Sequence, residues 1–282
     1  MAGQAPQLRV PLVAQPAQQA RAVGLVPAMG VAGPPQQMTM TAAMSHLAGM
    51  DRVEIQEKAR LSEVVAQDLL GVGYEAANKY KVLDPRNPHQ MVFFAHEKTG
   101  FCKRQCQNGC IKDCVGFELD MTYTARGSHE PFFHIKRHSS CTCCCLNRPI
   151  LEVTDTATGH ALGSIRNPFR CCNLVFNMRD VNEQDVLIAE GGCCQWGLIC
   201  PLPCGPCSEV KFPIRDAQTG APVAEIQKKV PSCLKFLFAS DVDNYKIEFG
   251  NVQNPQYKAL VMAMALFIDF RYFNVNEEQQ QN

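Results

Sequence analysis

The chain has 282 residues, and its 27 Lys and Arg residues balance its 27 Asp and Glu residues, so the formal net charge is zero. A neutral chain has no global field that would attract nucleic acid or an anionic surface, so we predict no nucleic-acid partner and expect any membrane contact to be local. The N-terminus has no recognisable secretory signal and the cytosol keeps thiols reduced, so the sixteen cysteines favour buried, metal-bound or acylated thiols over disulfides.

Residues 1–46 are rich in Ala, Gln, Pro, Gly and Met, and the first acidic residue of the chain is Asp51. Such a segment buries too little apolar surface to offset the entropy cost of ordering, so we predict a disordered tail. Pro34 and Pro35 form no strong proline-rich ligand pattern, which leaves open both a solvated leader and a segment that binds protein partners.

The segment Asp51–Leu70 carries apolar residues at roughly helical spacing, with charged residues between them. Gly71 and Gly73 follow it, where the C-terminal cap of a helix commonly has glycine. The pattern predicts a helix. Its apolar positions are Val53, Ala59, Leu61, Val64, Val65 and Leu69.

From Tyr80 onward, short alternating or apolar runs separated by turn residues replace the helical pattern. Many short strands favour a sandwich or a closed barrel over a parallel α/β fold, and closure would remove the exposed strand edges. The expected strands are Tyr80–Leu83, Val92–His96, Phe117–Tyr123, Pro131–Arg137, Ile150–Val153, Ala161–Arg166, Asn173–Asn177, Val186–Ala189, Val210–Ile214, Pro222–Gln227, Lys235–Ala239 and Asn244–Phe249.

One internal repeat supports an antiparallel arrangement. Asp155–Ile165 aligns without gaps on Asp216–Ile226, at an offset of 61 residues. Each copy has a strand, an Asp-x-x-Thr-Gly turn and a second strand, and the Gly supplies the positive φ that such a turn tends to need. A pseudo-duplicated barrel and two independently similar hairpins both explain the match.

The segment Ala259–Phe270 is expected to form a helix that is apolar on all sides, which is typical of a membrane span or of a helix surrounded by protein. A span needs about 20 apolar residues. Extending the helix to Tyr257–Phe273 includes the charged Asp269 and Arg271. These charges favour a helix buried in a closed barrel, and the transmembrane span stays the alternative.

The acidic segment Asp241–Phe249 places two carboxylates, Asp241 and Asp243, two residues apart. Two carboxylates with backbone carbonyl oxygens can bind a hard cation such as Ca²⁺. Val252 stands where a full EF-hand loop has its last Glu, so a calcium site here would be weak, with a Kd of about 10⁻⁴ to 10⁻³ M. A hairpin turn without a metal explains the spacing equally well.

One group of cysteines follows the basic stretch Lys136–His138 and has a functional interpretation. It consists of Cys141, Cys143, Cys144 and Cys145. Basic residues beside exposed thiols suit S-acylation at an anionic membrane face, and two or more acyl chains make anchoring stable. A second group, Cys102–Cys114, recurs every four residues, and a cysteine-based metal protein is therefore a further alternative. For the remaining cysteines we expect burial.

The sequence contains no recognisable catalytic constellation. Its histidines are scattered, no serine lies in a nucleophile elbow, and no glycine-rich phosphate loop follows a predicted strand. We therefore predict that the protein is not an enzyme.

Several motifs, taken in their order along the chain, resemble the phospholipid scramblase family over residues 47–275. They are Gly73–Tyr80, the cysteine-rich middle, Ser240–Phe249 and Ala259–Phe273. The resemblance implies a tubby-like fold, which is a mainly β, closed antiparallel barrel of twelve strands around a hydrophobic C-terminal helix. It also implies a barrel domain at 47–275, between a disordered tail at 1–46 and a polar tail at 276–282.

The resemblance implies Ca²⁺-dependent, ATP-independent movement of phospholipids between membrane leaflets, with Ca²⁺ as cofactor and phospholipids as partners. The implied place is the cytoplasmic face of the plasma membrane, reached by acyl chains, by a single pass of the helix, or by both, and the oligomeric state stays open. The implied calcium residues are Asp241, Asp243, Tyr245, Ile247 and Phe249, and the implied acylated residues are Cys141, Cys143, Cys144 and Cys145.

The chain departs from this family at Val252, where the family has a carboxylate, and in its cysteine run, which is shorter and lacks an internal proline. The alternative function is a tubby-like adaptor that binds phosphoinositides or other headgroups at a membrane and moves no lipid. The headgroup patch of such an adaptor would consist of Lys136, Arg137, Lys228 and Lys229.

Overall fold

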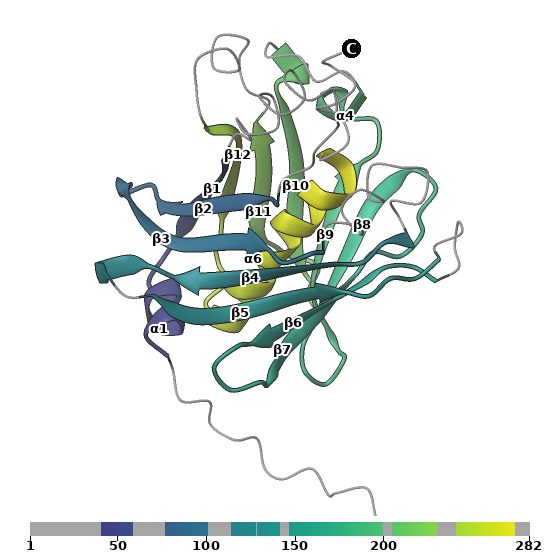
Figure 1. Cartoon of the computed structure of the whole chain (residues 1–282). Coiled ribbons are helices and arrows are strands. Elements are labelled where there is room, and N and C mark those ends of the chain that lie inside the picture. Colours follow the sequence, from purple (N-terminus) through teal and green to yellow (C-terminus); the bar gives the residue numbers. More distant parts are fainter. Residues whose placement is uncertain are drawn as a thin grey trace, which may run out of the picture. The chain divides into compact units, whose positions relative to one another are not determined.

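The computed structural model describes residues 41–58, 77–100, 114–127, 129–141, 147–199, 205–229 and 241–273. Residues from Met40 onward form one compact unit, in which twelve antiparallel strands close into a barrel in chain order (Figure 1). The predicted closed, mainly β fold is confirmed. The strands are β1 (Arg52–Lys58), β2 (Lys79–Asp84), β3 (Asn87–Glu97), β4 (Phe117–Tyr123), β5 (Glu130–Arg137), β6 (Ile150–Asp155), β7 (Ala161–Arg166), β8 (Asn173–Arg179), β9 (Asp185–Gly192), β10 (Glu209–Asp216), β11 (Pro222–Lys229) and β12 (Asp241–Glu248). The described helices are α1 (Ala42–Ala48), α4 (Trp196–Ile199), α6 (Pro255–Ile268), η2 (Ala125–Gly127), η3 (Gly205–Cys207) and the π-helical turn η4 (Asp269–Phe273).

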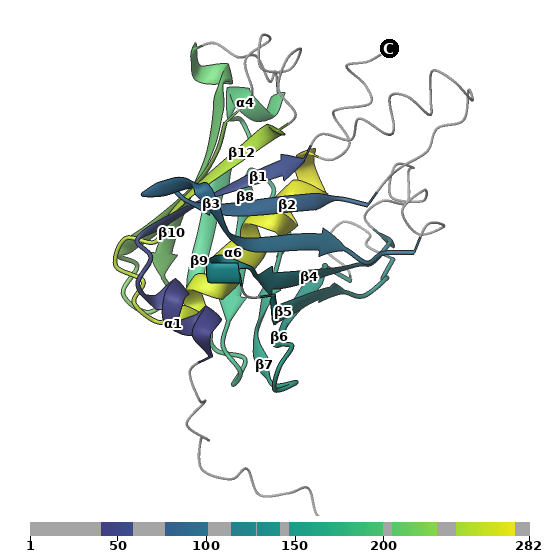
Figure 2. The ribbon, with the colours of Figure 1, turned by 60° about the vertical axis from the view of Figure 1, so that its left-hand side comes forward.

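Helix α6 runs through the interior of the barrel (Figure 2). Asn254 caps its start by accepting the backbone N–H of Gln256, and Pro255 occupies its first turn, where no N–H is needed. Every residue from Lys258 to Ile268 is buried. The strands supply the surrounding apolar side chains by alternation, as in β4, whose odd-numbered residues are all buried. The prediction of a buried central helix is confirmed.

The helix predicted over Asp51–Leu70 is wrong for its first part, because residues 52–58 form strand β1. Val53, Ile55 and Glu57 point into the barrel with a period of two, while β1 pairs with β12 on one side and β2 on the other. Pairing on both edges overrides the weak helical spacing of this segment. Residues 59–76 lie outside the described ones.

Helix α1 lies immediately before β1, in a region that the sequence assigned in part to the tail. The Thr41 side chain caps it by accepting the backbone N–H of Met44 at 3.2 Å. Its buried face consists of Ala43, Met44 and Leu47. The rest of the predicted tail lies outside the described residues.

The other strand predictions agree with the structure, since each of β2 to β12 overlaps a predicted strand. The predicted strand Lys235–Ala239 lies outside the described residues. The barrel therefore reaches twelve strands through β1, which the sequence did not predict as a strand.

The two copies of the internal repeat form matching hairpins, β6–β7 and β10–β11. The Asp155 carboxylate accepts two backbone N–H groups of its turn at 2.8 and 2.9 Å, and Asp216 does the same at 3.0 and 2.8 Å. Gly159 and Gly220 have φ values of 72° and 70°, in the left-handed region that favours glycine. The predicted turn chemistry is confirmed.

The alternating strand directions give the barrel two ends, each with its own set of connections. The connections at the first end, which we call the turn end, are 85–86, 124–129, 156–160, 180–184, 217–221 and 249–254. The connections at the second end, which we call the thiol end, are 59–78, 98–116, 138–149, 167–172, 193–208 and 230–240. All sixteen cysteines of the sequence fall within the thiol-end set.

Candidate functional site at the end of the central helix

Strand β12 and the residue after it carry the predicted calcium residues, and the described side chains among these five belong to the barrel core. Tyr245, Ile247 and Phe249 are each at most 1% exposed. The backbone of β12 pairs with β1 and with β11, so its N–H and C=O groups form the hydrogen bonds of the sheet. The side chains of Asp241 and Asp243 lie outside the described ones.

Asp269 is fully buried where α6 ends, in the interior of the thiol end. Its Oδ1 accepts hydrogen bonds from Tyr245 Oη at 2.6 Å and Lys228 Nζ at 3.1 Å. Its Oδ2 accepts one from Tyr80 Oη at 2.8 Å. These partners come from β12, β11 and β2, so one carboxylate joins the helix end to three strands. A buried charge needs such pairing to be tolerated.

Lys228 is the counter-ion of Asp269 and is itself only 3% exposed. Its Nζ also lies 4.0 Å from the ring centroid of Phe273 and 4.9 Å from that of Tyr245, which is cation–π geometry. Removing one member of a buried ion pair leaves the other uncompensated and costs about 3–5 kcal/mol. We call Tyr80, Lys228, Tyr245 and Asp269 the carboxylate cluster.

The carboxylate cluster does not fit a calcium ion, which takes about six to eight oxygen ligands. It contains a single carboxylate, and Lys228 neutralises it. The Tyr245 hydroxyl is bonded to Asp269, while Ile247 and Phe249 have no oxygen in their side chains. Among the described residues, no three His, Cys, Asp or Glu side chains gather in a way that could hold a metal ion. Among the five predicted calcium residues, side-chain ligation would therefore depend on Asp241 and Asp243.

Lys258 anchors the other end of α6, near the turn end. Its Nζ donates to the carbonyl oxygens of Ala48 at 2.8 Å, Met50 at 2.6 Å and Leu47 at 3.4 Å. The carbonyl oxygens of Ala48 and Met50 lie at and beyond the end of α1, where intrahelical donors run out, whereas that of Leu47 also accepts the Met50 N–H at 3.1 Å. Burial lowers the pKa of the Lys258 ammonium, and the charge of Asp51 opposes that shift.

Helix α6 is therefore held inside the barrel at both ends and along its length. Phe267 packs edge-to-face on Phe176, with ring centroids 5.7 Å apart, and Phe270 stacks on Phe117 at 4.2 Å. Within the part of the chain that the structure describes, no helix is both long enough and apolar enough to cross a bilayer.

The predicted acylation residues belong to the connection 138–149 at the thiol end. Cys141 is exposed, and Cys143, Cys144 and Cys145 lie outside the described residues. The expected burial of the other thiols is wrong for those that can be judged, because Cys171, Cys172 and Cys194 are exposed and Cys114, Cys193 and Cys207 are half-buried. The reason is their position, since strands and helix α6 fill the core and the cysteines lie in connections.

The predicted headgroup patch of the adaptor alternative is wrong for two of its four residues. Lys228 and Arg137 are 3% and 5% exposed, because alternation along β11 and β5 points them inward. Lys136 is half-buried with Glu118 at 3.3 Å, and Lys229 is exposed. A patch of these four residues therefore does not exist on the surface.

The carboxylate cluster as a unit was not predicted from the sequence. A usable signal was present, since Asp269 directly follows ten apolar residues in a helix and a lone acid in that position needs a buried partner. The identity of the partners could not be read in the same way. Tyr80 and Lys228 are 189 and 41 residues away from Asp269 in the sequence, and only barrel closure brings them together.

Comparison with known proteins shows which family the chain resembles. A family model described as Scramblase matches residues 31–275. Phospholipid scramblase 1 of Mus musculus is 26% identical over 256 residues, which cover 88% of this chain and 69% of that protein. Phospholipid scramblase 1 of Homo sapiens is 27% identical over 257 residues, covering 91% and 73%, and phospholipid scramblase 4 of Homo sapiens is 23% identical over 265 residues, covering 90% and 71%. No solved structure matches the chain significantly.

Proposed function

The chain belongs to the scramblase family, and on that premise we propose that it moves phospholipids between the two leaflets of a membrane and carries out no covalent chemistry. The observation that supports the proposal is the extent of the family match, which runs over residues 31–275 and so includes the whole described barrel, the central helix and the carboxylate cluster. Its relatives are phospholipid scramblases by name.

The physical task is to lower the cost of taking a polar headgroup through hydrocarbon, where unpaired polar groups are expensive. We propose that α6 stays inside the barrel during this task, because the hydrogen bonds of Lys258 hold its start and those of Asp269 hold its end. Lipid movement then comes from disturbance of the bilayer by a barrel at its surface. Protease protection of a tag placed after residue 282 in sealed vesicles tests this, since a tag protected on the far side requires a span.

The function itself is tested with purified full-length protein in liposomes that carry a fluorescent phospholipid in both leaflets. Quenching of the outer leaflet is followed without nucleotide, with and without Ca²⁺. The proposal expects more than half of the fluorescence to be quenched, because inner-leaflet lipid moves outward (about half is outer-leaflet lipid in a symmetric bilayer). Quenching that matches protein-free liposomes in every condition overturns it.

We further propose that Ca²⁺ increases this activity through Asp241 and Asp243, the carboxylates of the predicted calcium segment. The supporting observation is that the other three predicted calcium residues, Tyr245, Ile247 and Phe249, are core residues, which leaves the two aspartates as the candidate ligands of the predicted set. Asp241→Asn with Asp243→Asn is expected to remove the calcium response. Glu248→Gln, at an exposed position of the same strand, is the matched control.

We propose that the thiols at Cys141 and Cys143–Cys145 are S-acylated and hold the protein at the cytoplasmic face of the plasma membrane. The accessibility of Cys141 supports this. Acyl-exchange labelling of protein from cells, with these four cysteines changed to serine, is expected to lose its signal, whereas Cys171→Ser with Cys172→Ser is expected to keep it. Binding of protein partners by residues 1–46 and self-association stay predictions.

A second candidate function is a membrane-bound adaptor that binds lipid headgroups without moving lipid. The observation that favours it is the enclosure of α6, because a helix fixed inside a barrel offers no polar path through the bilayer. The liposome assay separates the two functions. Binding to the liposomes without quenching of inner-leaflet lipid supports the adaptor.

A further inference from the structure

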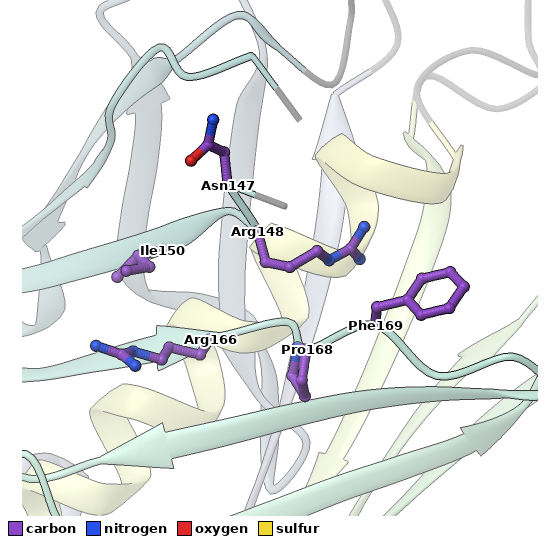
Figure 3. A pocket seen from close by; sticks show the side chains of 6 residues that line it. All are labelled: Asn147, Arg148, Ile150, Arg166, Pro168 and Phe169. Atoms are coloured by element: carbon purple, nitrogen blue, oxygen red, sulfur yellow. The ribbon is translucent and has the colours of Figure 1, made fainter. Parts of the chain in front are cut away.

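A cleft opens at the thiol end between the connections 138–149 and 167–172 (Figure 3). Its volume is about 520 Å³, within the range of about 300–1,000 Å³ that is typical of small-ligand sites. Figure 3 shows Arg148 extending toward Phe169, whereas Arg166 extends the opposite way, below Ile150. The lining residues are Asn147, Arg148, Ile150, Arg166, Pro168 and Phe169.

Arg148 is held in a fixed orientation by Asn167. Its Nε donates to the backbone oxygen of Asn167 at 2.9 Å, and its Nη2 donates to Oδ1 of the same residue at 2.6 Å. Asn167 is only 2% exposed and donates its Nδ2 to the Val175 carbonyl at 2.8 Å. A guanidinium that is already ordered loses little conformational entropy when an anion binds.

Arg166 lies on β7 between Ile150 of β6 and Asn177 of β8. Its Nε is buried, and within the described part of the chain that atom has no hydrogen-bond partner and no carboxylate pairs with the side chain. A buried donor without an acceptor is costly. Since no carboxylate pairs with it among the described residues, Arg166 leaves a positive charge beside the cleft, which attracts a phosphate.

The surroundings of the cleft are basic and apolar. The connections 138–149, 167–172 and 193–208 contain no Asp or Glu, although the chain as a whole is neutral. They are adjacent on the rim, because β5 to β10 are consecutive in the barrel. Phe169 and Trp196 in these connections are 51% and 59% exposed. Tryptophan is enriched at the headgroup level of membranes, and local positive charge is attracted to anionic lipid.

We propose that this cleft binds the phosphate group of a membrane phospholipid and that the described parts of these three connections form the surface by which the protein docks on a membrane. Arg148, which extends toward Phe169, contacts the phosphate, and Arg166 adds positive charge on the opposite side of the cleft. Phe169 and Trp196 enter the headgroup layer. The apolar lining and the exposed aromatic rings favour a lipid over free phosphate. The inference rests on the proposed function only in that the protein acts at a membrane, and it requires no lipid movement.

Trp196 is the only tryptophan of the chain, so its emission reports docking directly. Full-length protein with reduced, unacylated thiols is titrated with vesicles of phosphatidylcholine, with and without phosphatidylserine. A blue shift is expected, at lower lipid concentration when phosphatidylserine is present. Arg166→Gln and Arg148→Gln are each expected to weaken binding to the anionic vesicles roughly fivefold, which corresponds to about 1 kcal/mol for a basic residue near such a surface.

Phe169→Ala is expected to weaken binding by a similar factor. Because Phe169 is exposed, this variant keeps the test decisive if an arginine variant fails to fold. Arg215→Gln and Val181→Ala change exposed residues at the turn end and are the matched controls, which are expected to bind like the wild type.

Wild-type binding by both Arg166→Gln and Phe169→Ala overturns the proposal, and so does an equal loss in the turn-end controls. Inorganic phosphate alone is the soluble comparison, and a shift that phosphate produces and vesicles do not produce also overturns it. The liposome assay keeps the two proposals apart. Docking through the cleft without lipid movement contradicts only the proposed function, whereas lipid movement together with wild-type vesicle binding by the Arg166→Gln and Phe169→Ala variants contradicts only this inference.

Discussion

The two ends of the barrel are built in different ways. At the turn end, Asp155 and Asp216 are the last residues of their strands and Asp180 is the first residue of its connection, and each carboxylate accepts two backbone N–H groups of its own turn. At the thiol end, connections such as 138–149 and 193–208 are longer, carry cysteines and contain no acidic residue.

This difference separates the groups that hold the fold from the groups that are available to a partner. A turn that satisfies its own N–H groups needs nothing from the rest of the molecule. The thiol end instead leaves basic and aromatic side chains at the surface and keeps the carboxylate cluster in the interior of the same end. Substitutions at the two ends are therefore expected to have different consequences.

The largest expected effect is that of Asp269→Ala in the carboxylate cluster. This change leaves Lys228 buried without a counter-ion, so the free energy of unfolding is expected to fall by about 3–5 kcal/mol. Urea denaturation followed by circular dichroism, with thiols reduced, measures the loss. Glu183→Ala, at a position exposed in a turn, is the control. A loss below about 1 kcal/mol, typical of an exposed ion pair, would contradict the role of the cluster.

The next effect is that of Lys258→Met at the opposite end of α6. The change leaves carbonyl oxygens at the end of α1 without their donor and is expected to cost about 1–3 kcal/mol at pH 7. The exposed Lys211, changed to Met in parallel, controls for the loss of a surface charge.

The same variant tests the lowered pKa of Lys258. Since the pKa of Lys258 in the folded protein lies below its ordinary value of 10.5, the unfolded chain binds this proton more tightly. The charged, buried ammonium therefore lowers the free energy of unfolding, and this penalty is fully present at pH values below the folded pKa. The penalty disappears as the pH rises toward 10.5, so the stability of the wild type relative to Lys258→Met is expected to increase between pH 7 and pH 10. A stability difference between the wild type and Lys258→Met that shrinks from pH 7 to pH 10 would contradict the lowered pKa of Lys258.

A smaller effect is expected for Asp155→Ala at the turn end. Two backbone N–H groups lose their acceptor, and the free energy of unfolding is expected to fall by about 1–2 kcal/mol. Asp155→Asn keeps an acceptor oxygen and is expected to recover most of the loss. Vesicle binding measured through Trp196 is expected to be unchanged in both variants, and a loss of binding would mean that the two ends are coupled.

The smallest effect on stability is expected for Phe169→Ala at the thiol end. The side chain is 51% exposed, so the free energy of unfolding is expected to change by less than about 0.5 kcal/mol while vesicle binding falls. Val181→Ala, 56% exposed at the turn end, is expected to change neither quantity. A large destabilisation by Phe169→Ala would show that this ring holds the fold instead of contacting a membrane.

The features that could be predicted from the sequence are those with a local cause. The strands from β2 to β12 follow from alternating apolar residues between turn residues, and the matching turns at Asp155 and Asp216 follow from one five-residue pattern. Strand β1 was predicted as a helix because its segment has an ambiguous period. Only pairing with β12, nearly 190 residues further along the chain, settles its conformation.

The amino-acid sequence was sufficient to predict a strand-rich chain, an apolar helix over Ala259–Phe270 and motifs that resemble the phospholipid scramblase family. Which side chains contact one another depends on the three-dimensional fold. Closure of the barrel turned Lys228 from an expected surface residue into the buried partner of Asp269, and it brought Arg148 and Arg166 to one cleft. The physical reason is that turns and strand patterns depend on neighbours in sequence, whereas a buried ion pair or a cleft depends on residues from strands that only the closed sheet makes adjacent.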